Sequence, residues 1–181
     1  MGTVEPIKDK KDIEKIKKIL SKQSTRNLLM FEIGINCGLR ISDILALKVQ
    51  DVKNKNHIEI VEKKTKKKRI VPLNQNLKLL IKKYTKNKED DDPLFKSKKS
   101  KKHLDRFCAY KIINETCQKI NLSDNFGTHT LRKTFGYHFY KKYKDIAMLQ
   151  KIFNHSSPDI TLRYIGISQE EIYKSCLNFY L

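Results

Sequence analysis

The sequence lacks the marks of several protein classes. No apolar run approaches the roughly 18 residues that a membrane span needs, and no signal-peptide pattern opens the chain. No G-x-x-x-x-G-K-[ST], G-x-G-x-x-G or H-E-x-x-H motif occurs, so ATP, dinucleotide and zinc-protease chemistry have no support. The four cysteines show no C-x-x-C spacing, and we expect reduced, mostly buried thiols in a cytoplasmic protein. They are Cys37, Cys108, Cys117 and Cys176.

Arginine is scarce in a chain that is strongly basic. The sequence holds 39 basic against 20 acidic residues, a formal charge of +19, yet only six of the basic residues are arginine. A compact body with this charge attracts polyanions, so nucleic acid or an anionic membrane surface leads the expected partners. Because lysine supplies the general charge, each arginine needs its own explanation. The arginines are Arg26, Arg40, Arg69, Arg106, Arg132 and Arg163.

The length of 181 residues suits one domain, and a hydrophobic fraction of 39% is too high for a disordered basic tail. Two β-like runs, 58–61 and 69–73, are separated by a lysine-rich connection and predict a small antiparallel unit. Ser157-Pro158 is typical of a helix start, with serine as the cap and proline in the first turn. Residues 86–102 are predicted to form a solvated loop. The expected fold is mostly α with a small antiparallel β-sheet. Helical spacing of apolar residues predicts helices around 13–20, 28–35, 41–47, 77–84, 107–120, 131–139 and 146–153.

A few polar side chains could carry chemistry, although each alone has a simpler structural interpretation. His129 and Arg132 stand three apart near a helix start and project from one face. Arg40 follows a break at Gly38, near a helix start that favours anions, but such an arginine often only pairs with a neighbour such as Asp43. The remaining candidates are His155 and Tyr164, nine residues apart.

Together these residues match a pattern. The sequence resembles the tyrosine recombinase (phage integrase) family from about Ile13 to Tyr164, in the order, identity and interval of four boxes. The boxes are Gly38–Leu47 with the first arginine, the lysine-rich Lys63–Lys66 before Arg69–Leu73, the H-x-x-R stretch His129–Phe135, and Asn154–Ser157 followed by Thr161–Tyr164. The resemblance implies the DNA breaking-rejoining catalytic-domain fold. It also implies a site-specific recombinase that cleaves and rejoins DNA through a 3′-phosphotyrosyl intermediate.

The resemblance assigns a role to each candidate. Arg40 and Arg132 face the non-bridging oxygens of the scissile phosphate, for which planar, permanently charged guanidiniums are better suited than lysine. His155 adds a hydrogen bond, Tyr164 is the nucleophile and His129 the candidate general base. A hairpin lysine protonates the leaving 5′-oxygen. Counting back from Val71-Pro72-Leu73 favours Lys64, with Lys66 and Lys63 as alternatives. No metal, ATP or other cofactor is expected.

The sequence departs from the family pattern at three points, of which the first is the excess of hairpin lysines from which the acid must be chosen. Asn154 stands where the family usually has glycine, and fewer than forty residues precede Arg40. We therefore expect residues 1–181 to be one catalytic domain without the N-terminal core-binding domain, either a fragment or a naturally short recombinase. Residues 165–181 should form a C-terminal tail helix, whose apolar stripe (Ile172, Cys176 and Phe179) packs on its own domain or on a neighbouring protomer.

Double-stranded DNA is the expected partner. The resemblance implies a homo-oligomer, a tetramer, on DNA and allows a monomer when free, with no membrane association. Two alternatives stay open. One is a type IB topoisomerase-like relaxing activity, and the other a non-catalytic basic module that binds nucleic acid electrostatically.

Overall fold

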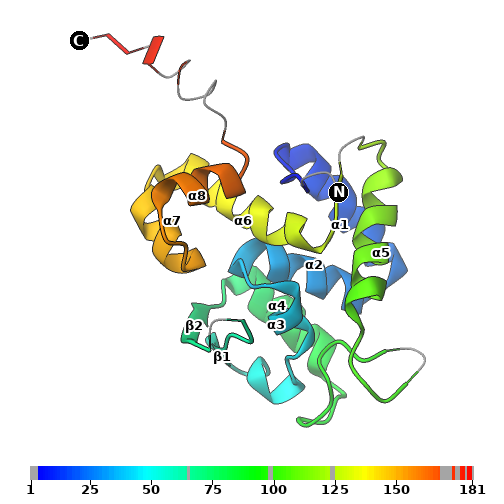
Figure 1. Cartoon of the computed structure of the whole chain (residues 1–181). Coiled ribbons are helices and arrows are strands. Elements are labelled where there is room, and N and C mark those ends of the chain that lie inside the picture. Colours follow the sequence, from blue (N-terminus) through cyan, green and yellow to red (C-terminus); the bar gives the residue numbers. More distant parts are fainter. Residues whose placement is uncertain are drawn as a thin grey trace.

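The computed structural model describes residues 4–64, 66–97, 100–122 and 125–167, and the single positions 173, 176, 177, 179 and 180. These residues form a helical body with one two-stranded antiparallel sheet (Figure 1), which confirms the predicted fold class. The elements are α1 (Lys10–Gln23), α2 (Thr25–Cys37), α3 (Ile41–Leu45), the 3-10 helix η1 (Val49–Asp51), β1 (His57–Val61), β2 (Lys68–Pro72), α4 (Gln75–Thr85), α5 (Arg106–Gln118), α6 (Thr128–Tyr143), α7 (Ile146–Phe153) and α8 (Pro158–Tyr164).

Helix α2 lies at the centre of the body, and α1 packs against it. Asp9 caps α1 with its side chain, and Ile13, Ile16 and Leu20 give that helix one buried face. Ser24 ends α1 and also caps α2, so the two helices follow each other without a loop. Helix α2 is apolar over most of its length and packs against α1, α4 and α6. It is the buried helix that the sequence predicts.

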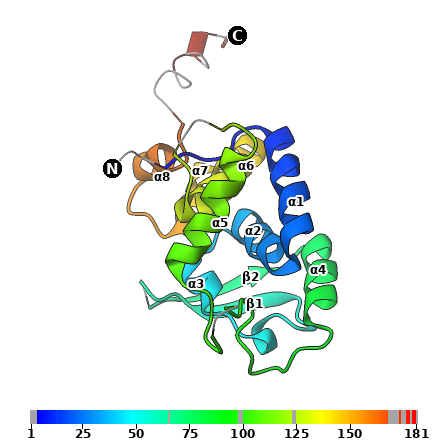
Figure 2. The same cartoon turned by 90° about the vertical axis from the view of Figure 1, so that its right-hand side faces the viewer.

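Strands β1 and β2 form the predicted hairpin. Ile58 lies opposite Val71, and both side chains are buried against the helical body. Pro72 has no N–H to donate and lies opposite His57 at the open end of the ladder, where a two-stranded sheet tolerates it. Figure 2 shows the hairpin across the lower end of the body, close to α3 and α4. The loop that joins the strands carries the lysine-rich segment.

The apolar side chains form two clusters that α6 joins. Leu131, near the start of α6, belongs to the large cluster around α1 and α2. Phe135, one helical turn later, packs against a smaller cluster that includes Phe153 and Ile165. Helices α7 and α8 therefore form a small unit attached to the body through α6 (Figure 1). Gly136 permits the close approach, because a Cβ there would lie 2.6 Å from Ile165 Cγ2.

Gly38 shapes the turn after α2. Its φ of +58° lies in the left-handed region, and an added Cβ would also collide with the ring of Phe135. Arg40 follows in an extended conformation, and its carbonyl accepts from the backbone N–H groups of Asp43 and Ile44 to start α3. The predicted break is confirmed, and it leaves Arg40 at a helix entrance instead of inside a helix.

The four cysteines are free thiols, but the expectation that most are buried is wrong. Cys37 and Cys117 are buried, and burial raises the pKa of each thiol to about 12. Cys108 and Cys176 are exposed. Cys108 lies in the first turn of α5, where three of its neighbours also face solvent, so apolar character alone misled the prediction.

The chain leaves α8 through a turn in which Ile165 and Ile167 are buried. The tail helix predicted over 165–181 does not begin in this turn, and most of that segment, Ile172 included, falls outside the described residues. Phe179, from the predicted apolar stripe, is 70% exposed. In the part of the chain that the structure describes, no helix is both long and apolar enough to cross a membrane.

Candidate active site

Arg40 lies where α3 meets the hairpin. Its Nη1 donates to Oε2 of Glu62 at 2.6 Å, while Oε1 of the same carboxylate accepts from Nη1 of Arg69 at 3.4 Å. The alternative pairing with Asp43 is wrong, because that carboxylate accepts from the backbone N–H of Lys63 at 3.0 Å. A hairpin residue therefore holds Arg40, and 18% of the arginine side chain remains open to solvent.

Arg132, in the second turn of α6, is almost fully buried and is held by carbonyl groups from two other segments. Nη1 donates to the carbonyl of Gly38, and Nη2 donates to that of Phe153 at 3.0 Å. The guanidinium also lies 4.3 Å from the centroid of the Phe153 ring. Burial lowers the pKa of Arg132 to about 10, so the group still carries its charge at neutral pH. A positive charge is thus fixed where the turn after α2 meets the end of α7.

His155 lies in the turn between α7 and α8. Asn154 ends α7 with a φ of 53°, a left-handed conformation that asparagine tolerates better than most residues, which explains how it replaces a glycine. Nδ1 of His155 lies 3.1 Å from Oγ1 of Thr161, whose hydroxyl donates to the carbonyl of Ser157 at 3.2 Å. Because the hydroxyl proton is already used, Nδ1–H is the donor, and Nε2 is left to meet a ligand.

The His155 ring carries no permanent charge. Burial lowers its pKa, and the charges on Arg132 and Arg40 lower it further. With the proton on Nδ1, a neutral ring offers a lone pair at Nε2, and only the imidazolium offers an N–H there. An anion placed at Nε2 would favour the protonated ring, which then offers an N–H to that anion.

Tyr164 is the last residue of α8 and is half-buried beside these groups. Its ring meets the ring of His155 edge-on, with centroids 5.1 Å apart, and the ring of Phe153 at 5.5 Å. Burial raises the pKa of Tyr164, while the charges of Arg132 and Arg40 act in the opposite direction. The phenol is therefore neutral at pH 7 in the free chain, but it lies next to the cation that would stabilise its anion.

His129 occupies the first turn of α6 as an exposed residue. Surrounding protein atoms desolvate part of its ring and lower its pKa, and four nearby cations lower it further. Those cations are Arg106, Lys133, Arg132 and Lys64. A neutral imidazole at pH 7 is the state that can accept a proton. The hairpin lysine Lys64 is thus close enough to His129 to act on its titration.

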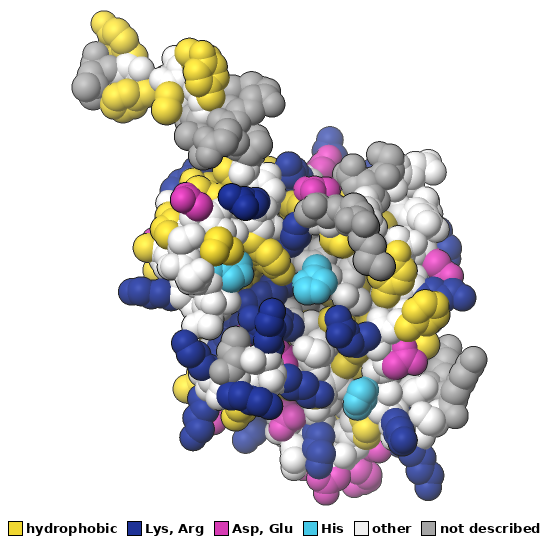
Figure 3. Space-filling view, in the orientation of Figure 1, with side chains coloured by type: hydrophobic (Ala, Val, Ile, Leu, Met, Phe, Trp, Pro, Cys, Tyr) yellow, Lys and Arg dark blue, Asp and Glu magenta, His cyan; other side chains and the backbone are white. Residues whose placement is uncertain are grey.

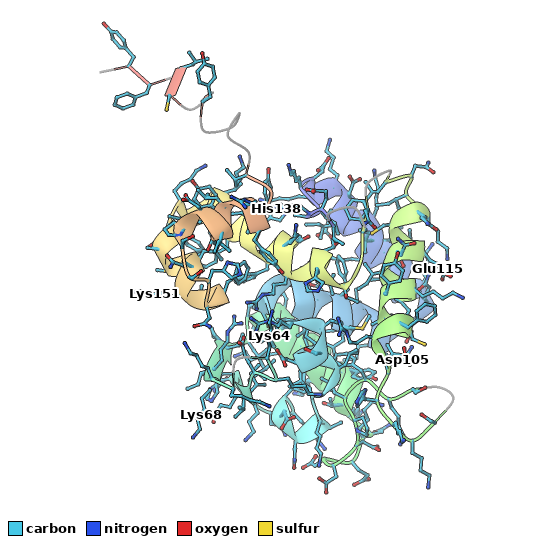
Figure 4. The ribbon with its side chains drawn as sticks, viewed as in Figure 1. Lys64, Lys68, Asp105, Glu115, His138 and Lys151 are labelled. Atoms are coloured by element: carbon cyan, nitrogen blue, oxygen red, sulfur yellow. The ribbon has the colours of Figure 1, made fainter. Side chains whose placement is uncertain are left out.

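The other hairpin lysines have different surroundings. The backbone N–H of Lys63 is bound to the side chain of Asp43, and Lys66 takes a left-handed conformation with φ 59°. Lys67 donates from Nζ to Oδ1 of Asn154 at 2.7 Å, which links the hairpin to the turn after α7. Figure 4 shows Lys64 nearer the centre of the molecule than Lys68 at the outer side of the hairpin.

A cleft of about 340 Å³ separates the hairpin from α7. Glu62 and Arg69 line it on the hairpin side, and Lys151 and Asn154 line it on the side of α7. In Figure 3, lysine and arginine side chains gather on and around the hollow beside the hairpin, with histidine near its rim. Such a concave, positive surface suits a polyanion. Among the described residues, no group of three His, Cys, Asp or Glu side chains could hold a metal ion.

Four of the predicted site residues are directly connected. Arg132 donates to the turn that precedes Arg40, its charge lies close enough to Tyr164 to act on the phenol, and Tyr164 packs on His155. His129 and Lys64 join them through electrostatic proximity. Sequence reasoning missed Glu62, Arg69 and Thr161 as supports of this group. The scarcity of arginine was the one sequence signal that could have pointed to Arg69. Glu62 gave no such signal, because a single acid in a lysine-rich stretch is typical of a solvated surface.

Comparison with known proteins agrees with this geometry. The sequence profile of the phage integrase family matches residues 8–171. The "Probable integrase/recombinase YoeC" of Bacillus subtilis (strain 168) is 49% identical over 170 residues, which cover 94% of this chain and 93% of that protein.

Two solved structures share the fold. The crystal structure of XerA recombinase superposes with a TM-score of 0.78 at 19% identity, covering 100% of this chain and 66% of that chain. The crystal structure of the XerH site-specific recombinase bound to difH substrate, a pre-cleavage complex, superposes with a TM-score of 0.72 at 21% identity. The match covers 99% of this chain and 56% of that chain. The expected DNA breaking-rejoining fold is confirmed, and this chain spans about two thirds or less of each of those chains.

Proposed function

The chain belongs to the phage integrase family, and on that premise we propose that it is a site-specific tyrosine recombinase that cleaves and rejoins DNA through Tyr164. The observation that carries the proposal is the convergence of Arg40, Arg132, His155 and Tyr164 from four separate segments, close enough for both arginine charges to act on the imidazole and on the phenol. A nucleophile, two guanidiniums and an imidazole in one place can attack a phosphate and stabilise the charge that develops on it.

In the proposed reaction, the two arginines receive the scissile phosphate. Its non-bridging oxygens carry negative charge, and the pentacoordinate transition state concentrates more of it there. Arg132 is fixed by main-chain carbonyls and Arg40 by a carboxylate, so neither guanidinium needs to reorganise during the reaction. His155 adds a donor at Nε2 once the phosphate has raised its proton affinity.

Tyr164 then attacks phosphorus. The phenolic proton passes to His129, the phenolate oxygen forms a bond to phosphorus, and the bond from phosphorus to the 5′-oxygen breaks. The leaving 5′-oxygen takes a proton from Lys64, which prevents release of an unstable alkoxide. The low pKa of His129 and its proximity to Lys64 support this division of roles. A 5′-hydroxyl attacking the phosphotyrosine reverses the sequence and reseals the strand without ATP.

Duplex DNA is the partner in this scheme. The net charge of +19 and the basic cleft support it, as does the fold shared with the XerH recombinase, which was solved with its difH substrate bound. We further propose that four copies assemble on two DNA sites, because recombination needs four strands to be cut and exchanged. Leu177, Phe179 and Tyr180 near the C-terminus are exposed apolar side chains that a neighbouring copy could cover.

A covalent capture experiment tests the function without knowledge of the target site. A pool of duplexes is randomised on both sides of one 5′-bridging phosphorothiolate, a linkage whose thiol leaving group departs without protonation and religates poorly. Incubation followed by a denaturing gel should give a protein–DNA adduct from the wild-type chain and none from Tyr164→Phe. A non-catalytic binding module would retain salt-sensitive binding in both proteins and give no adduct in either.

Relaxation of a supercoiled plasmid distinguishes the topoisomerase-like alternative. A recombinase that recognises a site should cleave a selected subset of the pool, and captured sequences should converge over repeated rounds. A relaxing enzyme of low specificity would instead relax the plasmid catalytically and give captured sequences that do not converge.

A further inference from the structure

Glu62 is a buried acid at the centre of a cluster of arginines. Only 4% of its side chain is exposed, although it lies in a loop-forming segment with five lysines in the next six positions. One carboxylate oxygen accepts from Arg40 at 2.6 Å, and the other accepts from Arg69 at 3.4 Å. Burying a carboxylate is costly unless cations and hydrogen bonds compensate it, so these contacts define where Glu62 can be.

Arg69 fixes the far side of this carboxylate. Its Nη2 donates to the carbonyl of Cys37 at 3.1 Å, and Nη1 lies 3.5 Å from that of Gly38. Those carbonyls end α2, where the helix dipole favours a cation. Arg69 is therefore bound to the end of α2, and its contact with Glu62 holds the carboxylate at a fixed place relative to that helix.

The backbone of Glu62 also closes the base of the hairpin loop. Its N–H donates to the carbonyl of Lys67 at 3.0 Å, and its carbonyl accepts from the N–H of Lys66 at 2.9 Å. Lys64 lies inside the loop that these two hydrogen bonds close. One residue thus connects the end of α2, the first arginine and the segment that carries the candidate acid.

The charge balance of the site gives Glu62 a second effect. The charges of Arg40 and Arg69 both lower the pKa of Arg132, which shows that three guanidiniums lie within range of one another. Without an intervening anion they would repel each other in a partly buried environment. Glu62 neutralises one of the three charges and holds Arg40 from one side, which leaves the other N–H donors of Arg40 for a ligand.

We propose that Glu62 is a positioning residue of this active site: it holds the guanidinium of Arg40 in place for the scissile phosphate. The inference rests on the proposed function, since it assigns Glu62 a task in the same reaction. Glu62 does not contact the reacting atoms in this account. It acts through Arg40, and through the loop of Lys64 by way of its backbone.

The variant that tests this is Glu62→Gln, which keeps the size of the side chain and one oxygen acceptor but removes the charge. The substrate is a sequence selected in the capture experiment and made with an ordinary phosphate at the scissile position. We expect its single-turnover cleavage rate to fall by roughly 10- to 100-fold, the size expected for one lost charge-assisted contact. DNA binding should change by less than about threefold, because the site becomes more positive and the lysine-rich surface is untouched. Glu59→Gln is the matched control, since Glu59 is an exposed acid on β1, three positions before Glu62, and is paired with His57.

A second substrate separates positioning from a merely structural role. A methylphosphonate at the scissile position replaces one charged non-bridging oxygen with a methyl group, so the site has less negative charge to stabilise. If Glu62 acts through Arg40, the ratio of wild-type to variant rate should fall toward 1 on this substrate for both Glu62→Gln and Arg40→Ala. The double variant should be no slower than Arg40→Ala alone, within about threefold.

Each other outcome overturns the inference. An equal loss on both substrates would make Glu62 a structural residue only, and faster cleavage by Glu62→Gln on the natural phosphate would make it a restraint on Arg40. Thermal melts report whether the variant folds. If Glu62→Gln does not fold, Glu62→Asp replaces it, because aspartate keeps the charge on a side chain that is one methylene shorter. Glu62→Asp must then lose cleavage rate on the natural phosphate and lose less of it on the methylphosphonate. Absence of any Tyr164 adduct from the wild-type chain would refute the proposed function itself, and this inference with it.

Discussion

Arg132 donates from Nη1 to the carbonyl of Gly38, 94 positions earlier in the sequence. That carbonyl belongs to the left-handed turn that leads to Arg40, so the two arginines of the site are positioned by the same short segment. The second contact of Arg132, to Phe153, reaches the end of α7 two residues before His155. A single side chain of α6 is therefore bound to the turn before Arg40 and to the end of α7, so its guanidinium supports the structure as well as carrying charge.

The first prediction concerns Arg132→Lys. Lysine keeps the charge but cannot donate to two carbonyls and a phosphate in one plane, so cleavage should fall by about 100-fold or more. Single-turnover rates on a captured suicide substrate measure the effect. Arg163→Lys is the matched control, because Arg163 is an exposed arginine of α8 next to the nucleophile. Equal cleavage rates in the two variants would contradict a role for the paired N–H donors of the Arg132 guanidinium.

The second prediction concerns the hydroxyl of Thr161, which lies between His155 and the carbonyl of Ser157. Thr161→Val preserves the shape and removes the acceptor for Nδ1–H, so cleavage should fall by roughly 5- to 20-fold with little change in DNA binding. Thr161→Ser should restore most of the rate, since it returns the hydroxyl. A valine variant as fast as wild type would show that the imidazole needs no partner at Nδ1.

A third prediction concerns the backbone at Asn154. Its φ of 53° costs an ordinary side chain about 1–2 kcal/mol, whereas glycine has no such cost. Asn154→Gly should therefore be more stable to urea than Asn154→Ala, by about 1 kcal/mol. Both variants lose the contact with Lys67, so the comparison isolates the backbone. Equal unfolding midpoints would mean that the turn relaxes away from the left-handed region.

The fourth prediction is an acid limb in the pH dependence of cleavage. A base must be neutral to accept a proton, and the pKa of His129 is lowered by desolvation and by nearby cations. The rate should be lost as pH falls through that lowered pKa, so the midpoint of the limb in kcat/KM should lie below about 6.5, the ordinary value for histidine. His129→Gln should remove the limb along with most of the rate. A limb unchanged in this variant would assign the titration to another group.

Much of the fold could be predicted because it rests on local patterns. Ile13, Ile16 and Leu20 repeat at the helical period, and Gly38 breaks the mostly apolar run that precedes it. The helices expected between residues 13 and 153 and the hairpin all occur, with differences of a few residues at the ends. Pro158 follows its cap residue Ser157 as predicted.

The supports of the site could not be predicted, because they are contacts between distant segments. Nothing local distinguishes Glu62 from a solvated acid until β1 and the end of α2 are placed together. The same holds for Asp43, which is near Arg40 in sequence but is bound to the hairpin instead. The resemblance supplied the candidate site residues one by one, while packing decided which partners hold them.

The central claim is that Tyr164 forms a covalent bond to DNA. The most direct measurement is mass spectrometry of the nuclease- and protease-treated adduct from the capture experiment. The account predicts one modified peptide, containing Tyr164, with a nucleotide attached through its 3′-phosphate to the phenolic oxygen. An adduct on another residue, a linkage through a 5′-phosphate, or no adduct from a folded wild-type chain would contradict it.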